Sequence, residues 1–126
     1  MSEPMWIAKP EVLAIHDRQL IEHGGAPGIR DVNLLASALA RPQQLFAYGD
    51  PDVLDLAAAY TAGIVRNHPF LDGNKRTGFV VGILFLELNG YTFTASEADA
   101  AQTVLALAAG ELTEEAFAVW LQDYSV

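Results

Sequence analysis

An almost uncharged stretch in the second half of the sequence sets the expected fold class. From Phe79 to Leu88 the only charged residue is Glu87. A helix that is apolar on nearly all sides is usually a buried one, so we expect this segment to be the central helix of an α-helical bundle. The run from Gly78 to Leu88 is too short to cross a bilayer, which needs about 20 apolar residues.

Turn and capping residues divide the rest of the chain into further helical segments. Four residues with a side-chain oxygen stand before apolar patterns of helical spacing, where they can accept from the first free backbone amides. These predicted N-caps are Asp31, Asp52, Ser96 and Thr113. Alternating β patterns are nearly absent. The sequence therefore predicts an all-α single domain over residues 1–126, with about six helices around a central buried helix.

Pro42 is expected to end the helix that follows Asp31, because a residue before proline is disfavoured in the helical region. Residues 43–51 would then form a surface loop that carries three large apolar or aromatic side chains. These are Leu45, Phe46 and Tyr48. They are either anchors in the core or part of a flap over a binding site. Residues 43–50 are candidate substrate contacts together with Arg30 and Asp31, although capping and packing explain Asp31 and Phe46 equally well.

Charge and composition exclude several classes of function. The net charge is −9, whereas binding to DNA or RNA normally uses a basic face, so we expect no direct nucleic-acid partner. The absence of cysteine excludes disulfides and thiolate metal sites. No secretory leader is visible, so a soluble cytoplasmic protein without a membrane partner is the default expectation.

Residues 68–77, with the sequence HPFLDGNKRT, concentrate chemically useful groups just before the apolar stretch. The first amides of a helix have no intrahelical acceptor and suit phosphate. Gly73 permits close approach to the backbone, Asn74 adds a neutral donor, and Lys75 and Arg76 add positive charge. We therefore predict that these four residues hold phosphate groups.

Two other groups in this run suggest a reaction. His68 can accept a proton near neutral pH, and Asp72 offers the oxygen ligand that Mg²⁺ prefers. A base, a metal ligand and an anion site together suit transfer of a nucleotide-derived group to a hydroxyl. An inert turn before a capped helix could produce the same pattern. The other two histidines, His16 and His23, are interpreted as ordinary helix-surface residues.

Residues 68–77 resemble the signature of the Fic/Doc superfamily, H-x-F-x-[D/E]-G-N-G-R-x-x-R, and specifically its Doc (death-on-curing) toxin branch. The matching positions are His68, Phe70, Asp72, Gly73, Asn74 and Arg76. Lys75 replaces a glycine and Phe79 replaces the second arginine of AMP-transferring Fic proteins, and both departures are those of Doc-type proteins. Residues 28–31, 34–35, 38–42 and 85–91 also resemble this family.

The resemblance implies an all-helical Fic fold and the toxin of a type II toxin–antitoxin module. Doc-type toxins are similar to kinases and phosphorylate a threonine of elongation factor Tu, which stops translation. Carried over by position, His68 would be the general base, Asp72 would hold Mg²⁺, and residues 73–76 would hold the phosphates of ATP. A Phd-like antitoxin is the expected inhibitor, since the internal inhibitory motif of some Fic proteins, [S/T]-x-x-x-E-[G/N], is missing.

Two alternatives remain open from the sequence. One is transfer of AMP or another nucleotidyl group through the same site, and the other is a non-catalytic module that binds an anion and an antitoxin. Lys75 and Phe79 together favour a kinase. Phe79 removes the phosphate contact of the second arginine, and Lys75 creates another contact nearby, so the nucleotide is expected to bind in a different orientation. The nucleotide would then present its γ-phosphate, rather than its α-phosphate, to the acceptor.

Overall fold

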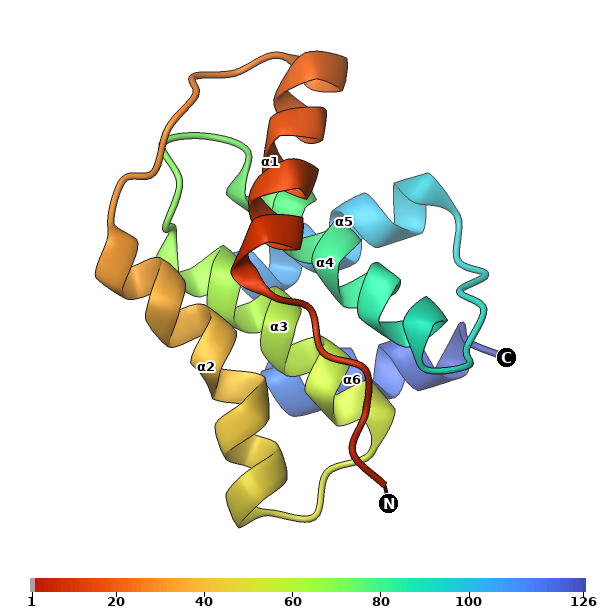
Figure 1. Cartoon of the computed structure of the whole chain (residues 1–126). Helices are drawn as coiled ribbons and strands as arrows, with labels where there is room; N and C mark the ends of the chain where they lie inside the picture. Colours follow the sequence, from red (N-terminus) through yellow and green to blue (C-terminus); the bar gives the residue numbers. More distant parts are fainter. Residues whose placement is uncertain (1) are drawn as a thin grey trace.

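The computed structural model describes residues 2–126 and contains six α-helices joined by short connections (Figure 1). The helices are α1 (Lys9–His23), α2 (Val32–Tyr48), α3 (Val53–Asn67), α4 (Asn74–Leu88), α5 (Glu97–Ala108) and α6 (Glu114–Asp123). Within the described residues, extended pairing is limited to two isolated bridges, Ile29 with Phe70 and Phe93 with Ser125. The predicted all-α architecture of about six helices is confirmed.

The central helix of the bundle is α3, whereas the sequence pattern had favoured α4. α3 is buried without interruption from Leu56 to Val65, and it contacts α2, α4, α5 and α6. Figure 1 shows α3 running between α2 and α4. Small residues such as Ala58 and Gly63 let its neighbours approach from several sides. Large side chains on α4, including Phe79 and Ile83, are only half-buried.

Close packing between α3 and α4 fixes the position of α4. A Cβ atom at Gly82 would lie 2.2 Å from Thr61 Oγ1, and one at Gly78 would lie 2.9 Å from Val65 Cγ2. The Thr61 hydroxyl also donates a 2.8 Å hydrogen bond to the carbonyl of Gly78. The two glycines therefore bring the helices together at a distance that no larger residue allows, and this places the first turn of α4.

Side-chain caps begin most of the helices where the sequence predicts them. In each case a backbone amide donates to the side-chain oxygen of the N-cap residue: Leu34 to Asp31 Oδ1, Asp55 to Asp52 Oδ1, Asp99 to Ser96 Oγ and Ala116 to Thr113 Oγ1. α4 differs from these helices because its N-cap is Gly73, which supplies no side-chain acceptor. The N-terminus of α4 therefore has no side-chain oxygen on its first amides.

α2 does not end at Pro42 but continues to Tyr48, so the predicted loop over residues 43–51 is wrong for most of its length. A proline inside a helix costs about 3 kcal/mol. Burial offsets this cost, because Leu45 and Phe46 extend the apolar face that packs on the core. The Phe46 ring meets Trp6 edge-on at 5.6 Å. Leu45 and Phe46 are thus core anchors, whereas Tyr48 is 91% exposed.

The residues before α1 form an extended arm that lies against the core. The amide of Ile7 donates to the Tyr60 hydroxyl at 3.0 Å, and the same hydroxyl donates to the Ile7 carbonyl at 3.1 Å. This pair of bonds ties the arm to the middle of α3. None of the helices in residues 2–126 combines the length and apolarity that a membrane crossing requires.

Candidate active site

All six predicted site residues line one pocket of about 740 Å³. They are His68, Asp72, Gly73, Asn74, Lys75 and Arg76. They lie on the connection between α3 and α4, residues 68–73, which we call the site loop, and on the first turn of α4. Side chains of α1 and α5 form the other walls. The structure therefore brings the polar residues of the sequence motif to the end of α4 that lacks a side-chain cap.

His68 ends α3 in a left-handed backbone conformation, with φ of 49° and ψ of 55°. It is the one non-glycine residue with positive φ in the described part of the chain. Such a conformation is strained, and strained residues persist where surrounding structure holds them. The His68 side chain is exposed, whereas the next two residues are buried. The Pro69 carbonyl accepts from the segment just before α2, and the Phe70 ring stacks on His16 of α1.

A segment between α1 and α2, residues 28–31, holds this strained turn. The Arg30 guanidinium donates to the carbonyls of His68 at 2.6 Å and Asn67 at 2.9 Å. The backbone amides of Arg30 and Asp31 both donate to the Pro69 carbonyl, at 2.7 and 3.1 Å. Arg30, a candidate substrate contact in the sequence, is thus bonded to the backbone carbonyls that surround His68.

Asn74 is buried and its side-chain amide is bonded within the site loop. Its Oδ1 accepts from the Phe70 amide and its Nδ2 donates to the Phe70 carbonyl, both at 3.0 Å. The same Nδ2 lies 3.4 Å from His68 Nδ1. This last contact is long for a hydrogen bond, and because an amide N–H group only donates, His68 Nδ1 is the acceptor in it. The Asn74 side chain therefore links Phe70 to His68.

Asp72 is held by two backbone amides. Its Oδ2 accepts from the Ala26 amide at 3.2 Å, and its Oδ1 accepts from the Gly73 amide at 2.9 Å. These two hydrogen bonds, that from Ala26 first, lower the pKa of the Asp72 carboxyl below its ordinary value. Gly25 makes room for the carboxylate, since it has a φ of +127° and a Cβ there would lie 2.9 Å from Asp72 Oδ2.

We expect the Asp72 carboxyl to titrate below its ordinary pKa of 3.8. A carboxyl whose pKa falls on folding adds stability above the unfolded pKa, and this contribution is lost as the pH falls through the folded pKa. The stabilising effect should therefore be complete above about pH 5 and decline below pH 4. A ¹³C NMR titration of the Asp72 carboxyl checks this, and a midpoint at or above 3.8 would contradict it.

The donor set around Asp72 fits a magnesium ion that is bound together with phosphates. No group of three or more acidic or histidine side chains in residues 2–126 is placed to hold a metal by itself. Mg²⁺ is usually bound through one or two carboxylates, waters and substrate phosphates rather than by an all-protein cage. One carboxylate beside an uncapped helix N-terminus and two cations meets that requirement. A zinc site, which needs three or four protein ligands, does not fit.

Positive charge next to Asp72 comes from Lys75 and Arg76. Both side chains are exposed, both line the pocket, and neither forms an ion pair with another of residues 2–126. They follow Gly73, the N-cap residue that has no side chain. Their charges therefore add to the partial positive charge of the helix N-terminus. The pocket can therefore bind a strongly anionic group at this end.

Another part of the pocket lining is mostly apolar, apart from Glu97 of α5, and the sequence does not predict it. It is formed by α5 residues such as Ala101, Val104 and Leu105, together with Phe79 and Val80 of α4. Helical spacing places Ala101, Val104 and Leu105 on one face, but a single sequence does not say that this face borders a site. The pocket thus combines an anionic-ligand end with a wall suited to an apolar or aromatic group.

α1 contributes a further wall, through Gln19 and His23. Their spacing of four residues puts them on one helix face, and Gln19 is 8% exposed. His16, one turn earlier, is 3% exposed, so its interpretation as a helix-surface histidine is wrong. The error arises because α1 packs against α4, which buries a face that the mixed apolar spacing of α1 does not define.

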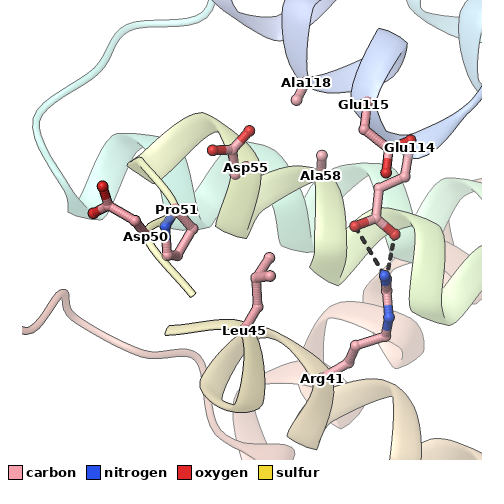
Figure 2. A pocket seen from close by; sticks show the side chains of 9 residues that line it. All are labelled: Arg41, Leu45, Asp50, Pro51, Asp55, Ala58, Glu114, Glu115 and Ala118. Carbon is pink, nitrogen blue, oxygen red and sulfur yellow. Dashed lines mark hydrogen bonds and ion pairs between the residues drawn. The ribbon is translucent and has the colours of Figure 1, made fainter. Parts of the chain in front are cut away.

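A second pocket, of about 330 Å³, lies between α2, α3 and α6 (Figure 2). Its lining includes Asp50, Asp55, Glu114 and Glu115. Its one cation, Arg41, makes two hydrogen bonds to the carboxylate of Glu114. Because the cation is already paired and the other charges are negative, this pocket does not suit a phosphate ligand. It also contains none of the predicted site residues.

The part of the chain that matches a known protein family includes this site. A sequence model described as the Fic/DOC family matches residues 6–86, which include α1 to most of α4. The chain is similar to "Protein kinase doc" of Escherichia phage P1, with 34% identity over 108 residues, 85% of each chain. It is also similar to "Toxin Doc" of Mycolicibacterium smegmatis, with 42% identity over 77 residues, which cover 60% of this chain and 59% of that protein.

Proposed function

The chain belongs to the Fic/DOC family, and from that premise we propose that it transfers the γ-phosphate of ATP to a hydroxyl group of another protein. The names of these two similar proteins support a Doc-type toxin with phosphotransferase activity. The observation that supports the proposal is a single pocket lined by His68, Asp72 and the first turn of α4, whose N-terminus has no side-chain cap.

Each part of the pocket has a role in this reaction. The acceptor hydroxyl gives its proton to His68 as its oxygen forms a bond to the γ-phosphorus, and the bond from that phosphorus to the β–γ bridging oxygen breaks, so that ADP leaves. Lys75, Arg76 and the first turn of α4 hold the phosphates and stabilise their charge. Asp72 would hold Mg²⁺, which neutralises phosphate charge when it is bound.

Two residues favour γ-phosphate transfer over AMP transfer. Lys75 adds a cation in the first turn of α4, where it lines the pocket. Phe79, one turn further along, is half-buried with its ring edge-on to Phe93 at 5.6 Å. An aromatic ring at this position offers no charge to a phosphate. The positive charge is therefore concentrated at the start of α4, beside Asp72 and Gly73.

The biological role that we propose follows from the resemblance to Doc-type toxins. The acceptor is a threonine of elongation factor Tu, the consequence is a block of translation in the cytoplasm, and the inhibitor is a Phd-like antitoxin. The apolar wall formed by Ala101, Val104 and Leu105 is compatible with an apolar segment of a protein partner in the same groove as the phosphates.

Labelled ATP tests the reaction directly. We expect label from the γ-phosphate, and none from the α-phosphate, to appear on elongation factor Tu after incubation with this protein and Mg²⁺. Mass spectrometry should then find one added phosphate on a threonine. Label transferred only from the α-phosphate would show that the protein is a nucleotidyl transferase. Binding of ATP without any transfer would favour the non-catalytic module.

A further inference from the structure

We propose that His16 is a positioning residue for the anion-binding end of the pocket, where it fixes the peptide group between Asp72 and Gly73. The inference deepens the proposed function, and it rests on that function where it concerns nucleotide binding. His16 is on α1, 56 residues away from Asp72 in the sequence. It touches the site loop from behind and does not line the pocket.

The first observation is a buried hydrogen bond. His16 is 3% exposed, and its Nε2 lies 2.8 Å from the backbone carbonyl oxygen of Asp72. A carbonyl oxygen only accepts hydrogen bonds, so Nε2 must carry the hydrogen. Burying an imidazole has a desolvation cost that a hydrocarbon side chain would avoid. The N–H group is therefore what distinguishes histidine from an apolar residue of similar size here.

The second observation is the tight enclosure of the ring. The His16 ring stacks on Phe70, with centroids 3.8 Å apart and planes 9° from parallel, and Phe70 is 1% exposed. A Cβ atom at Gly73 would lie 3.7 Å from His16 Nε2. The imidazole is thus packed between the core and the loop, so its N–H direction is set by packing.

The geometry links His16 to the carboxylate of Asp72. The Asp72 carbonyl and the Gly73 amide belong to one planar peptide group, so a bond that fixes the carbonyl also fixes the amide. That amide donates to Asp72 Oδ1 at 2.9 Å. His16 therefore holds the peptide group through its carbonyl, and the amide of the same peptide group holds the Asp72 carboxylate. This carboxylate is the group that we propose for Mg²⁺.

Two substitutions separate the hydrogen bond from the packing. In His16→Gln, the side-chain amide nitrogen can reach the place of imidazole Nε2 and donate to Asp72. In His16→Asn, the amide is one methylene shorter and corresponds to Nδ1, so it falls short of the carbonyl. Both variants lose the aromatic stack on Phe70. Ile21→Ala, at a position 84% exposed on the same helix, serves as the control.

We expect His16→Asn to bind Mg²⁺–ADP about tenfold more weakly than His16→Gln by calorimetry, since residues that orient a metal ligand typically have effects of 10- to 100-fold. His16→Asn should also melt below His16→Gln, because it leaves the buried carbonyl of Asp72 without its donor. The Gly73 amide should exchange with deuterium faster in His16→Asn than in His16→Gln and the parent. In kinetics, the difference should appear mainly in the KM for ATP rather than in kcat.

Equal Mg²⁺–ADP affinity and equal Gly73 exchange in the two variants would overturn the inference, because loss of the stack alone would then explain any change. The exchange measurement needs no ligand. If the parent protein failed to bind Mg²⁺–ADP, the proposed function would fail, and Gly73 exchange would still decide the role of His16. The Ile21→Ala control should match the parent in both measurements.

Discussion

Replacement of His68 by asparagine is expected to lower kcat for phosphate transfer by about 10²- to 10⁴-fold, the range typical for loss of a general acid–base group. The carboxamide of asparagine cannot take a proton from the acceptor hydroxyl near neutral pH. The His68 side chain is exposed, so its removal leaves no cavity in the core. Expression of this variant should consequently no longer arrest growth.

Asparagine is preferred to alanine because His68 has a φ of 49°. Asparagine is enriched several-fold among non-glycine residues with positive φ, so His68→Asn should keep the turn, the thermal midpoint and Mg²⁺–ADP binding. His68→Ala combines loss of the base with backbone strain and should also melt at a lower temperature. If His68→Asn transferred phosphate at the rate of the parent, proton transfer to His68 would not be part of the mechanism.

The second large effect is expected at Gly82, in the contact between α3 and α4. Gly82→Ala places a methyl group 2.2 Å from Thr61 Oγ1 and 3.2 Å from the Ala57 carbonyl. Overpacking of a filled core typically costs 1–3 kcal/mol, and we expect the free energy of unfolding to fall by about 2 kcal/mol. The thermal midpoint should then drop by roughly 5–10 °C, in spite of the better helix propensity of alanine.

A double-mutant cycle with Thr61→Ala tests the cause of this effect. Thr61→Ala alone should be destabilising, because Thr61 is 1% exposed and its hydroxyl bonds to the Gly78 carbonyl. In the Gly82→Ala background the same change removes the clashing oxygen, so the double variant should be more stable than the sum of the two single effects. Additive effects would locate the strain elsewhere, for example at the Ala57 carbonyl.

Helix starts were predictable from the sequence because each depends on neighbouring residues. Asp31, Asp52 and Thr113 all cap a helix through a backbone amide three residues later, a distance that the sequence states directly. Pro42 shows where such local rules fail. The local preference ends a helix there, but Leu45 and Phe46 bury their side chains only if the helix continues.

The residues of the candidate site were predictable from the sequence, but the hydrogen bonds that hold them in place were not. The sequence pattern named His68, Asp72 and Lys75, and all of them line one pocket. It did not reveal that Arg30 bonds the carbonyl of His68 or that Ala26 donates to Asp72. These contacts join positions about 40 residues apart or more. One partner in each is a backbone group, which the pattern of side chains does not reveal.

The sequence by itself determined the helical class, the helix starts and the ten-residue motif, because these depend on hydrophobic periodicity, capping and the identity of adjacent side chains. Tertiary structure alone decided that α3 rather than α4 is central, that α2 runs through Pro42, and that His16 is buried against the site loop. The physical reason is that burial and backbone hydrogen bonding between distant segments depend on how whole helices pack. For α3 and α4, that packing is set by the space left at Gly78 and Gly82.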